Sequence, residues 1–350
     1  MKGNLQLRFL LSIPVVMLAI IATLMSPAHG AGPPRVPSRH FEFTYQVTVP
    51  PQPSGSGSLR VWIPLPPDDA FQKISGLKII SSVSHTEASE SEYGDRSAYF
   101  APSAQQAARG FTVELRFVAT RLEHRVSFVS TSALSTETLS PEMRERYLQP
   151  DTLIPLNDTI AKLSQEQTQG ITDPLARARK LYDYVLATMK YDKSGTGWGH
   201  GDAMWACTAK RGNCTDFHSL FIGMARVAGI PARFEIGFPL PEDKTSSDIP
   251  GYHCWAEFYL DGIGWVPIDA SEGWKHPDKR DYFFGAHCFN RVQFSTGRDI
   301  KLSPAQTGDR LNYFVYPYAE VGGKPYEDLK THFAFKDIPS SQTALNQSGN

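Results

Sequence analysis

One cysteine stands where a reactive thiol could form. Residues 210–217 have the sequence KRGNCTDF, and apolar residues at spacings of three and four follow as far as Val227. This spacing predicts a helix with one buried face that starts at about Cys214, with Asn213 as its N-cap and Gly229 after its end. Free backbone N–H groups and the helix dipole stabilise an anion at that end, so we expect a lowered pKa for the Cys214 thiol. Cys214 is therefore a candidate nucleophile.

A histidine and an aspartate on two later segments could activate this thiol. Residues 252–260 are predicted to form a strand, whose period of two puts His253 and every second residue after it on one face. We expect that face to line a cleft. A three-residue loop would pair Leu260 with Gly264 and bring Asp269, at the end of the returning strand, to the face of His253. A two-residue loop without a bulge would put Asp269 on the opposite face.

These three residue types fit one reaction. His253 could take the thiol proton and later return it to a leaving amine, while Asp269 would hold the imidazole in the required tautomer. A Cys-His-Asp set is the usual means by which a thiolate attacks an unactivated amide. We therefore predict Cys214, His253 and Asp269 as catalytic residues, and we expect no cofactor and no metal ligand.

Around these residues the chain resembles the transglutaminase-like family of the papain-type cysteine superfamily, in its exported bacterial form. The resemblance covers about residues 173–300 and depends on four segments in order: GNC at 212–214, AGIPAR at 228–233, HCWAE at 253–257 and GWVPID at 264–269. It implies an α+β fold in which a helix packs on an antiparallel sheet, with Cys214, His253 and Asp269 as the triad.

The oxyanion stabiliser of the family is not fixed by a motif in this sequence. The backbone N–H of Cys214 is one natural donor. Trp198, Trp205 and Tyr191 are candidates for a second.

The rest of the chain divides into further predicted units. Short alternating or apolar segments separated by Pro, Gly and Ser predict an all-β, sandwich-like domain at residues 31–130. We interpret 131–172 as a linker, 173–338 as the transglutaminase-like catalytic domain and 339–350 as a disordered tail. Within the catalytic domain, residues 311–318 and 331–335 are predicted to form a closing hairpin.

The N-terminus carries a targeting signal. Lys2 and Arg8 precede an apolar run from Phe9 to Met25, and small residues follow this run. Residues 1–30 are therefore predicted to be a signal peptide. An uncleaved anchor is the alternative, and only this segment would then contact a membrane. We expect an exported protein, periplasmic or secreted.

The charge balance argues against a nucleic-acid partner. Without Lys2 and Arg8, the 35 basic and 36 acidic residues become 33 and 36, a net charge of −3. Such a balance lacks the basic surface that nucleic acids require, so the expected partner is a protein or peptide substrate. The oligomeric state stays open.

The four cysteines leave the disulfide pairing open. If Cys214 remains a free thiol, at most one bridge can join two of Cys207, Cys254 and Cys288, and the sequence does not choose the pair.

Three functions are compatible with these residues. The first is cysteine-dependent acyl transfer on peptide or glutamine amides through a thioester, with water as acceptor in a peptidase or amidase and an amine as acceptor in transamidation. The second is a zinc-stabilised binding module, because Cys214 and His218 lie four residues apart on one helical face. The third is a catalytically idle binding protein of the cell envelope.

Overall fold

The computed structural model describes Met1 and residues 36–128 and 138–339, and the described residues from Val36 onward belong to one unit. The predicted signal peptide after Met1 and the predicted tail after residue 339 lie outside them. None of the described helices is both long enough and apolar enough to span a bilayer.

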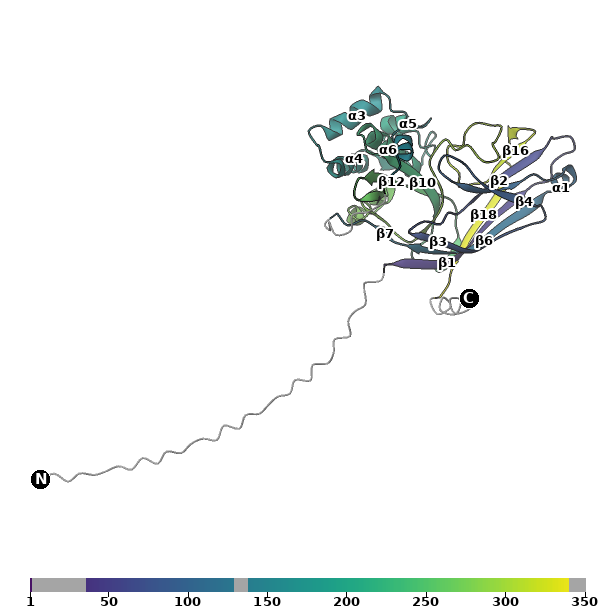
Figure 1. Ribbon diagram of the computed structural model, residues 1–350, viewed down its shortest axis with the longest axis horizontal. Helices are drawn as coiled ribbons and strands as arrows, with labels where there is room; N and C mark the ends of the chain where they lie inside the picture. Colours follow the sequence, from purple (N-terminus) through teal and green to yellow (C-terminus); the bar gives the residue numbers. More distant parts are fainter. Residues whose placement is uncertain (2–35, 129–137, 340–350) are drawn as a thin grey trace. The chain divides into compact units, whose positions relative to one another are not determined.

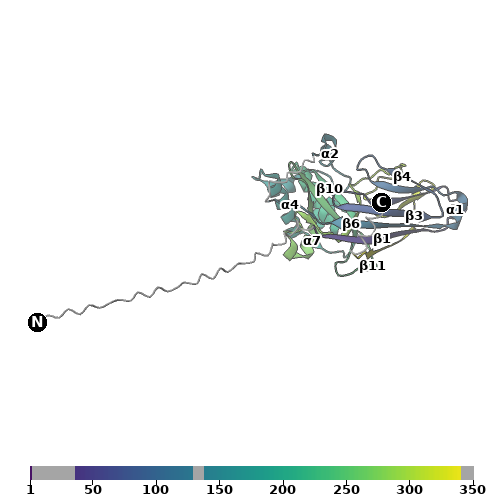
Figure 2. The same cartoon turned by 60° about the horizontal axis from the view of Figure 1, so that its bottom comes forward.

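Three larger antiparallel sheets make up most of the structure (Figures 1 and 2). The first has the order β11 (Ser246–Asp248), β18 (Lys330–Asp337), β1 (Ser38–Val49), β6 (Phe111–Leu122) and β3 (Gln72–Ser81). The second has the order β17 (Lys324–Pro325), β16 (Tyr318–Val321), β2 (Leu59–Leu65), β5 (Arg96–Phe100) and β4 (His85–Ser89). The third has the order β13 (Gly264–Ile268), β12 (His253–Leu260), β10 (Ala232–Pro239) and β15 (Arg291–Thr296).

Two short ladders and eight helices complete the described elements. The ladders join β14 (Ala286–His287) to β7 (His124–Arg125) and β8 (Lys190–Tyr191) to β9 (Arg211–Gly212). The helices are α1 (Ala104–Arg109), α2 (Pro141–Arg146), α3 (Asp158–Thr168), α4 (Pro174–Thr188), α5 (Ala203–Ala209), α6 (Cys214–Val227), α7 (Ala270–Lys275) and the 3-10 helix η2 (Pro277–Lys279).

The period-two pattern at the N-terminus forms the predicted strand. In β1 the residues Phe41, Phe43, Tyr45 and Val47 are buried, while those between them are half-buried or exposed. β6 lies on one side of β1 and β18 on the other, so Phe43 is paired with Phe117 and with Phe335. Like-facing aromatic residues thus meet across three strands, which stabilises this register.

The predicted closing hairpin is wrong. β16 pairs with β2, and β18 pairs with β1, so both C-terminal strands complete the two sheets of the predicted N-terminal domain. An alternating strand can pair with any edge of matching pattern, and the sequence contains no local signal that names its partner.

The predicted linker contributes to the helical layer. Helices α2 and α3 lie within residues 131–172, and Ser164 of α3 donates a hydrogen bond to the carbonyl of Met224 in α6. Residues 129–137 lie outside the described residues. The helical layer therefore begins before residue 173.

The third sheet carries the predicted helix-on-sheet arrangement. Helix α6 contacts β12 and β10, and Figure 1 shows these elements together with α4 beside them. Every residue from Cys214 to Arg226 is buried, because α3, α4 and α5 also pack on α6. The α+β fold class is thus confirmed.

The first and third sheets share one hydrophobic core. The ring centroid of Phe43 in β1 lies 5.5 Å from that of Phe238 in β10 and 5.8 Å from that of Phe294 in β15. Replacing one such buried phenylalanine by alanine costs about 3–5 kcal/mol. The β-rich part therefore supports the sheet that carries the site.

Candidate active site

The start of α6 positions the thiol. Asn213 has an extended backbone, and its side-chain oxygen accepts a hydrogen bond from the N–H of Thr215, while the Asp216 carboxylate accepts one from the N–H of Asn213. This capping box makes Cys214 the first residue of the helix, as predicted. The sulfur therefore lies at the positive end of the helix dipole.

Gly212 is required just before the helix. Its φ is +149°, and a Cβ atom there would lie 2.2 Å from the Oδ2 atom of Asp216. No side chain fits at that distance, so any other residue would displace the carboxylate that caps α6.

The hairpin of β12 and β13 has the predicted register. Leu260 pairs with Gly264 and Ala256 with Ile268, across a loop of three residues. Asp269 follows directly and becomes the N-cap of α7, where its Oδ1 atom accepts hydrogen bonds from the N–H of Glu272 and from the Ser271 hydroxyl. Its other oxygen is left for His253.

The structure brings the three predicted residues into one row. The Nε2 atom of His253 lies 2.7 Å from the Oδ2 atom of Asp269. A carboxylate only accepts, so Nε2 carries the proton and the Nδ1 side of the ring is left for Cys214. The side chains of His253 and Cys214 are hydrogen bonded to each other. All three residues are buried.

The electrostatics favour an ion pair. Burial opposes ionisation of Cys214, but hydrogen bonds from Cys254 and His253 and the charge of the imidazolium hold the pKa of the Cys214 thiol well below its usual value. Burial likewise opposes protonation of His253, yet the Asp269 carboxylate and the Cys214 thiolate raise the pKa of His253 to about 10. The site at neutral pH is therefore a thiolate beside an imidazolium.

Arg291 supports the carboxylate. Its Nη2 atom lies 3.3 Å from the Oδ2 atom of Asp269, and its guanidinium lies 4.6 Å from the ring centroid of Trp255. Burial would raise the pKa of Asp269, but the charges of His253 and Arg291 hold that pKa well below its usual value. Asp269 thus stays ionised. No motif in the sequence links Arg291 to Asp269, which lies 22 residues before it.

A second thiol and a second histidine lie directly behind the reacting groups. The backbone N–H and the thiol of Cys254 both hydrogen bond to Cys214, and burial together with the thiolate raises the pKa of Cys254 well above its usual value. Cys254 is therefore a thiol donor. His218 accepts a hydrogen bond from the N–H of Ala270 through Nε2, and its Nδ1 lies 3.6 Å from the Cys254 sulfur.

Asp216 also holds the glycine-rich loop beside the thiol. Its two oxygens accept hydrogen bonds from the N–H groups of Gly199 and Gly201. Arg298 donates hydrogen bonds to the carbonyls of His200 and Gly201 in the same loop, and its exposed fraction is only 1%. The loop at residues 193–202 therefore lies at the site.

The oxyanion candidates differ in their surroundings. The N–H of Cys214 has no acceptor among the residues that the structure describes, so it is available to a ligand. The indole N–H of Trp198 donates to Gly195 within its own loop. Tyr191 lies close enough to the site that burial and the Cys214 thiolate raise its pKa to about 12.

The structure adds Tyr252 to this set. Its hydroxyl accepts a hydrogen bond from the Asn213 amide at 3.0 Å. Burial and the Cys214 thiolate raise the pKa of Tyr252.

The predicted cleft face of β12 is wrong beyond His253. All eight residues of the strand are buried. The Trp255 indole donates to Glu235, and Glu257 is bonded to Arg233 and His124. These charged partners come from neighbouring strands and satisfy the polar face, so only the His253 end of the strand reaches the reacting groups.

The four cysteines are all free thiols, so no disulfide joins Cys207, Cys254 or Cys288. Within the described part of the chain, two groups of side chains could hold a metal ion: His124 with Glu257 and His287, and His253 with Asp269 and Glu272. Neither includes a cysteine. The predicted zinc site through Cys214 and His218 is disfavoured, because both ring nitrogens of His218 already have partners.

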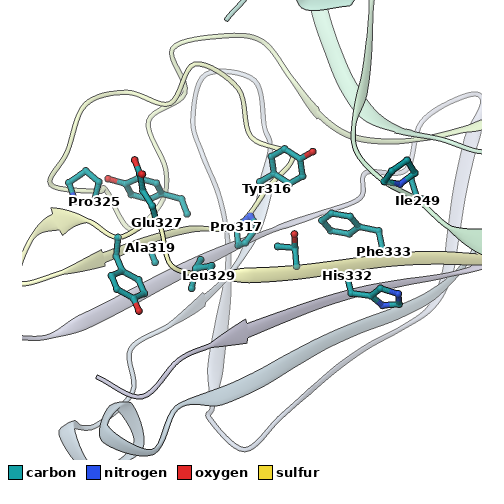
Figure 3. A pocket seen from close by; sticks show the side chains of 13 residues that line it. Ile249, Tyr316, Pro317, Ala319, Pro325, Glu327, Leu329, His332 and Phe333 are labelled. Atoms are coloured by element: carbon teal, nitrogen blue, oxygen red, sulfur yellow. The ribbon is translucent and has the colours of Figure 1, made fainter. Parts of the chain in front are cut away.

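A pocket of about 590 Å³ is lined by Ile249 and Pro250, which precede β12, and by residues of the C-terminal segment from Tyr316 to Phe333. Its lining is rich in tyrosine and proline, and Figure 3 shows Tyr316 and Phe333 near Ile249 at one end, with Pro325 and Glu327 at the other. The Tyr316 hydroxyl accepts a hydrogen bond from the backbone N–H of Tyr252, the residue before His253. The pocket is therefore connected to the strand that carries the imidazole.

Comparison with known proteins agrees with this arrangement. Residues 161–270 match the model of the Transglutaminase-like superfamily. An uncharacterized protein of Haemophilus influenzae is 28% identical over 323 residues, which cover 81% of this chain and 86% of that protein. The uncharacterized protein YebA of Bacillus subtilis is 26% identical over 148 residues, which cover 38% of this chain and 20% of YebA.

A solved structure shares the fold. It is described as a "putative cysteine protease" from Cytophaga hutchinsonii, and it matches with a TM-score of 0.59 at 16% identity, covering 87% of this chain and 92% of that one. Together with the helix packed on an antiparallel sheet, these matches confirm the resemblance: residues 161–270 are similar to the transglutaminase-like superfamily, and the chain has an α+β fold like that of the solved structure.

Proposed function

We propose that the protein is a cysteine-dependent acyl-transfer enzyme that acts on peptide or glutamine side-chain amides. Cys214 is the nucleophile, His253 the general acid and base, and Asp269 the residue that orients the imidazole. The observation that carries the proposal is the row of thiol, imidazole and carboxylate, with 2.7 Å between His253 Nε2 and Asp269 Oδ2. Burial of all three side chains strengthens their electrostatic interaction.

The reaction follows from the protonation states. The Cys214 thiolate attacks the amide carbonyl carbon, and the N–H of Cys214 donates a hydrogen bond to the oxyanion that forms. The His253 imidazolium gives its proton to the amide nitrogen, the C–N bond breaks, and an amine or ammonia leaves. A thioester at Cys214 remains, with His253 neutral.

The second half of the reaction depends on the acceptor. Neutral His253 takes a proton from water or from an amine as that acceptor attacks the thioester carbon, and the Cys214 thiolate leaves. Water yields an acid, as in a peptidase or amidase, and an amine yields a new amide, as in transamidation. The test must therefore supply both acceptors.

The tyrosine-lined and proline-lined pocket beside Tyr252 is the proposed subsite for the acyl side of the substrate. Extended peptides bind such aromatic surfaces well, because tyrosine rings present rigid apolar area. Replacing the exposed pocket residue Thr331 by tryptophan would fill part of this space. We expect Thr331→Trp to raise KM with little change in kcat, whereas Thr112→Trp, at an exposed position of β6 outside the pocket, should change neither.

Intact-mass spectrometry after incubation with a peptide-amide library tests the chemistry. We expect the wild type to trap an acyl group on Cys214 and to release acid products, or amide products when an amine is added. Cys214→Ala should do neither. A wild type that binds peptides without acylation or turnover would instead favour the idle binding protein.

Export remains part of the proposal. Its support is the sequence of the first 30 residues, with two basic residues, an apolar run and small residues after it. N-terminal sequencing of the protein recovered from the periplasm or the medium would show whether the segment is removed.

A further inference from the structure

A buried cluster of metal-binding side chains lies outside the reacting groups. His124 of β7 and His287 of β14 are direct partners across their two-stranded ladder. Glu257 of β12 faces them, and one nitrogen of each histidine and one oxygen of Glu257 all lie within 4.8 Å of one another. The exposed fractions of His124, Glu257 and His287 are 6%, 3% and 0%.

His287 is oriented as a ligand without a partner. Its Nε2 atom lies 3.0 Å from the carbonyl oxygen of Ile268, and because a carbonyl only accepts, Nε2 carries the proton. With the proton on Nε2, the lone pair of the neutral ring is on Nδ1. This Nδ1 is buried and has no hydrogen-bond partner.

An imidazole held in this way is typical of metal sites. Histidines that bind a metal usually donate their other ring N–H to a carboxylate or a backbone carbonyl, which fixes the tautomer and points the lone pair at the ion. A buried acceptor left unpaired destabilises the folded chain. A cation beside Nδ1 would remove that cost.

Glu257 has one oxygen for the cluster. Its Oε2 atom is bonded to Arg233, and its Oε1 atom lies 3.1 Å from Nδ1 of His124. Arg233 also pairs with Glu235 at 2.9 Å. Glu257 therefore holds Arg233 through one oxygen and presents the other oxygen to the histidines.

We propose that His124, Glu257 and His287 bind one divalent transition-metal ion, with zinc as the probe and water in the fourth position. Two imidazoles and one carboxylate are a common ligand set for zinc. Ligand atoms about 2.0–2.1 Å from a tetrahedral ion are about 3.3 Å apart. The His124–Glu257 separation of 3.1 Å already fits, and the most distant pair must close by up to about 1.5 Å.

The ion would join the N-terminal strands to the strands of the reacting groups. His124 follows β6 of the first sheet, whereas Glu257 lies on the same strand as His253. The Ile268 carbonyl that orients His287 belongs to the residue before Asp269. Binding would therefore hold β12 and β13 in place from outside the reaction centre and stabilise the folded chain.

The test uses the full chain, expressed without a histidine tag, in a Cys214→Ala background that removes the reactive thiol as a zinc ligand. After chelation and dialysis we expect one zinc per chain to bind with a Kd below about 1 μM. At about 100 times Kd the midpoint of thermal unfolding should rise by about 5 °C. X-ray absorption of the bound zinc should show two imidazoles and no sulfur.

Variants locate the site. His287→Gln and Glu257→Gln should each weaken zinc binding at least about 30-fold, whereas His276→Gln, at an exposed histidine outside the cluster, should leave it unchanged. No binding by the Cys214→Ala chain, sulfur in the zinc shell, or unchanged binding in folded His287→Gln would overturn the proposal. If neither cluster variant folds, the ligands seen by X-ray absorption decide the question.

Discussion

Replacing Asp269 by asparagine removes one negative charge from the buried row of reacting groups and keeps the size of the side chain. The asparagine oxygen can still cap α7, because asparagine is as good an N-cap as aspartate. The amide nitrogen then replaces Oδ2, so both the charge and the hydrogen-bond acceptor that face His253 and Arg291 are lost. The change therefore tests whether Asp269 sustains the ion pair of Cys214 and His253.

The expected size of the effect of Asp269→Asn follows from the pKa of the His253 imidazole. The pKa of His253 is raised from 6.5 to about 10, and its largest favourable cause is the Asp269 carboxylate. This difference in pKa corresponds to about 5 kcal/mol of favourable interaction with the protonated ring, because each pKa unit is equivalent to about 1.4 kcal/mol. Without Asp269, burial should bring the pKa of His253 below 7. Cys214 then loses its imidazolium, and we expect its pKa to rise toward that of an ordinary thiol.

The directions of the two pKa shifts define the pH range in which the ion pair of Cys214 and His253 exists. The thiolate exists above the low pKa of Cys214, and the imidazolium exists below about 10, the pKa of His253. The wild-type ion pair is therefore present between these limits, and turnover should fall on either side of them. In Asp269→Asn we expect no pH range in which the ion pair predominates, because the thiol and the imidazole are both neutral near pH 7.

The assay is the pH dependence of alkylation by iodoacetamide, read for each cysteine by mass spectrometry. We expect the inflection of the Cys214 rate at a pH well below that of an ordinary thiol in the wild type, and at a clearly higher pH in Asp269→Asn. The position of the inflection is used because a thiolate of low pKa is intrinsically less nucleophilic, which compresses the rates themselves. Cys207 is the internal control, since burial raises its pKa and its inflection should stay alkaline in both proteins.

Asp278→Asn is the matched variant. Asp278 is exposed in η2 nearby and should leave the profile of Cys214 unchanged. Circular dichroism must show that Asp269→Asn is folded, because the variant leaves Arg291 without its carboxylate. An inflection that stays at the wild-type pH in folded Asp269→Asn would refute the role given to Asp269.

Three further outcomes follow from the geometry. Cys214→Ala should lower amide turnover at least about 1000-fold with an unchanged unfolding midpoint, whereas Cys207→Ala should retain activity. Gly212→Ala should lower the free energy of unfolding by about 3 kcal/mol or more, because its Cβ would lie 2.2 Å from Asp216; urea titration measures this. Gly251→Ala is the control and should be tolerated, because the nearest atom to its Cβ would be 3.5 Å away. Asp216→Asn should lower kcat/KM about tenfold, since an amide cannot accept all three backbone N–H groups; unchanged kinetics would contradict the positioning role of this carboxylate.

Local chemistry explains why the triad could be predicted. The start of α6 depends on Asn213 and the apolar spacing after it, all within a few residues of Cys214. The register that brings Asp269 to His253 depends on a three-residue loop between adjacent strands. Signals of this kind are contained in one short segment, so the sequence is sufficient for them.

The supporting residues could not be predicted in the same way. Arg291 has no pattern that links it to Asp269, and Cys254 appeared to belong to the apolar face of its strand. The buried charges around Glu257 arise because β10, β7 and β14 supply partners for that face. A period of two indicates which residues share a face, but it does not indicate what covers that face.

The sequence by itself determined the helix that begins at Cys214, the strands and the hairpin that carry His253 and Asp269, and the α+β class. Only the tertiary structure decided that β16 and β18 complete the first two sheets and that His124 lies opposite His287. Caps, spacings and turns act over a few residues, whereas strand pairing over 160 to nearly 300 residues depends on which edges are free once the core has formed.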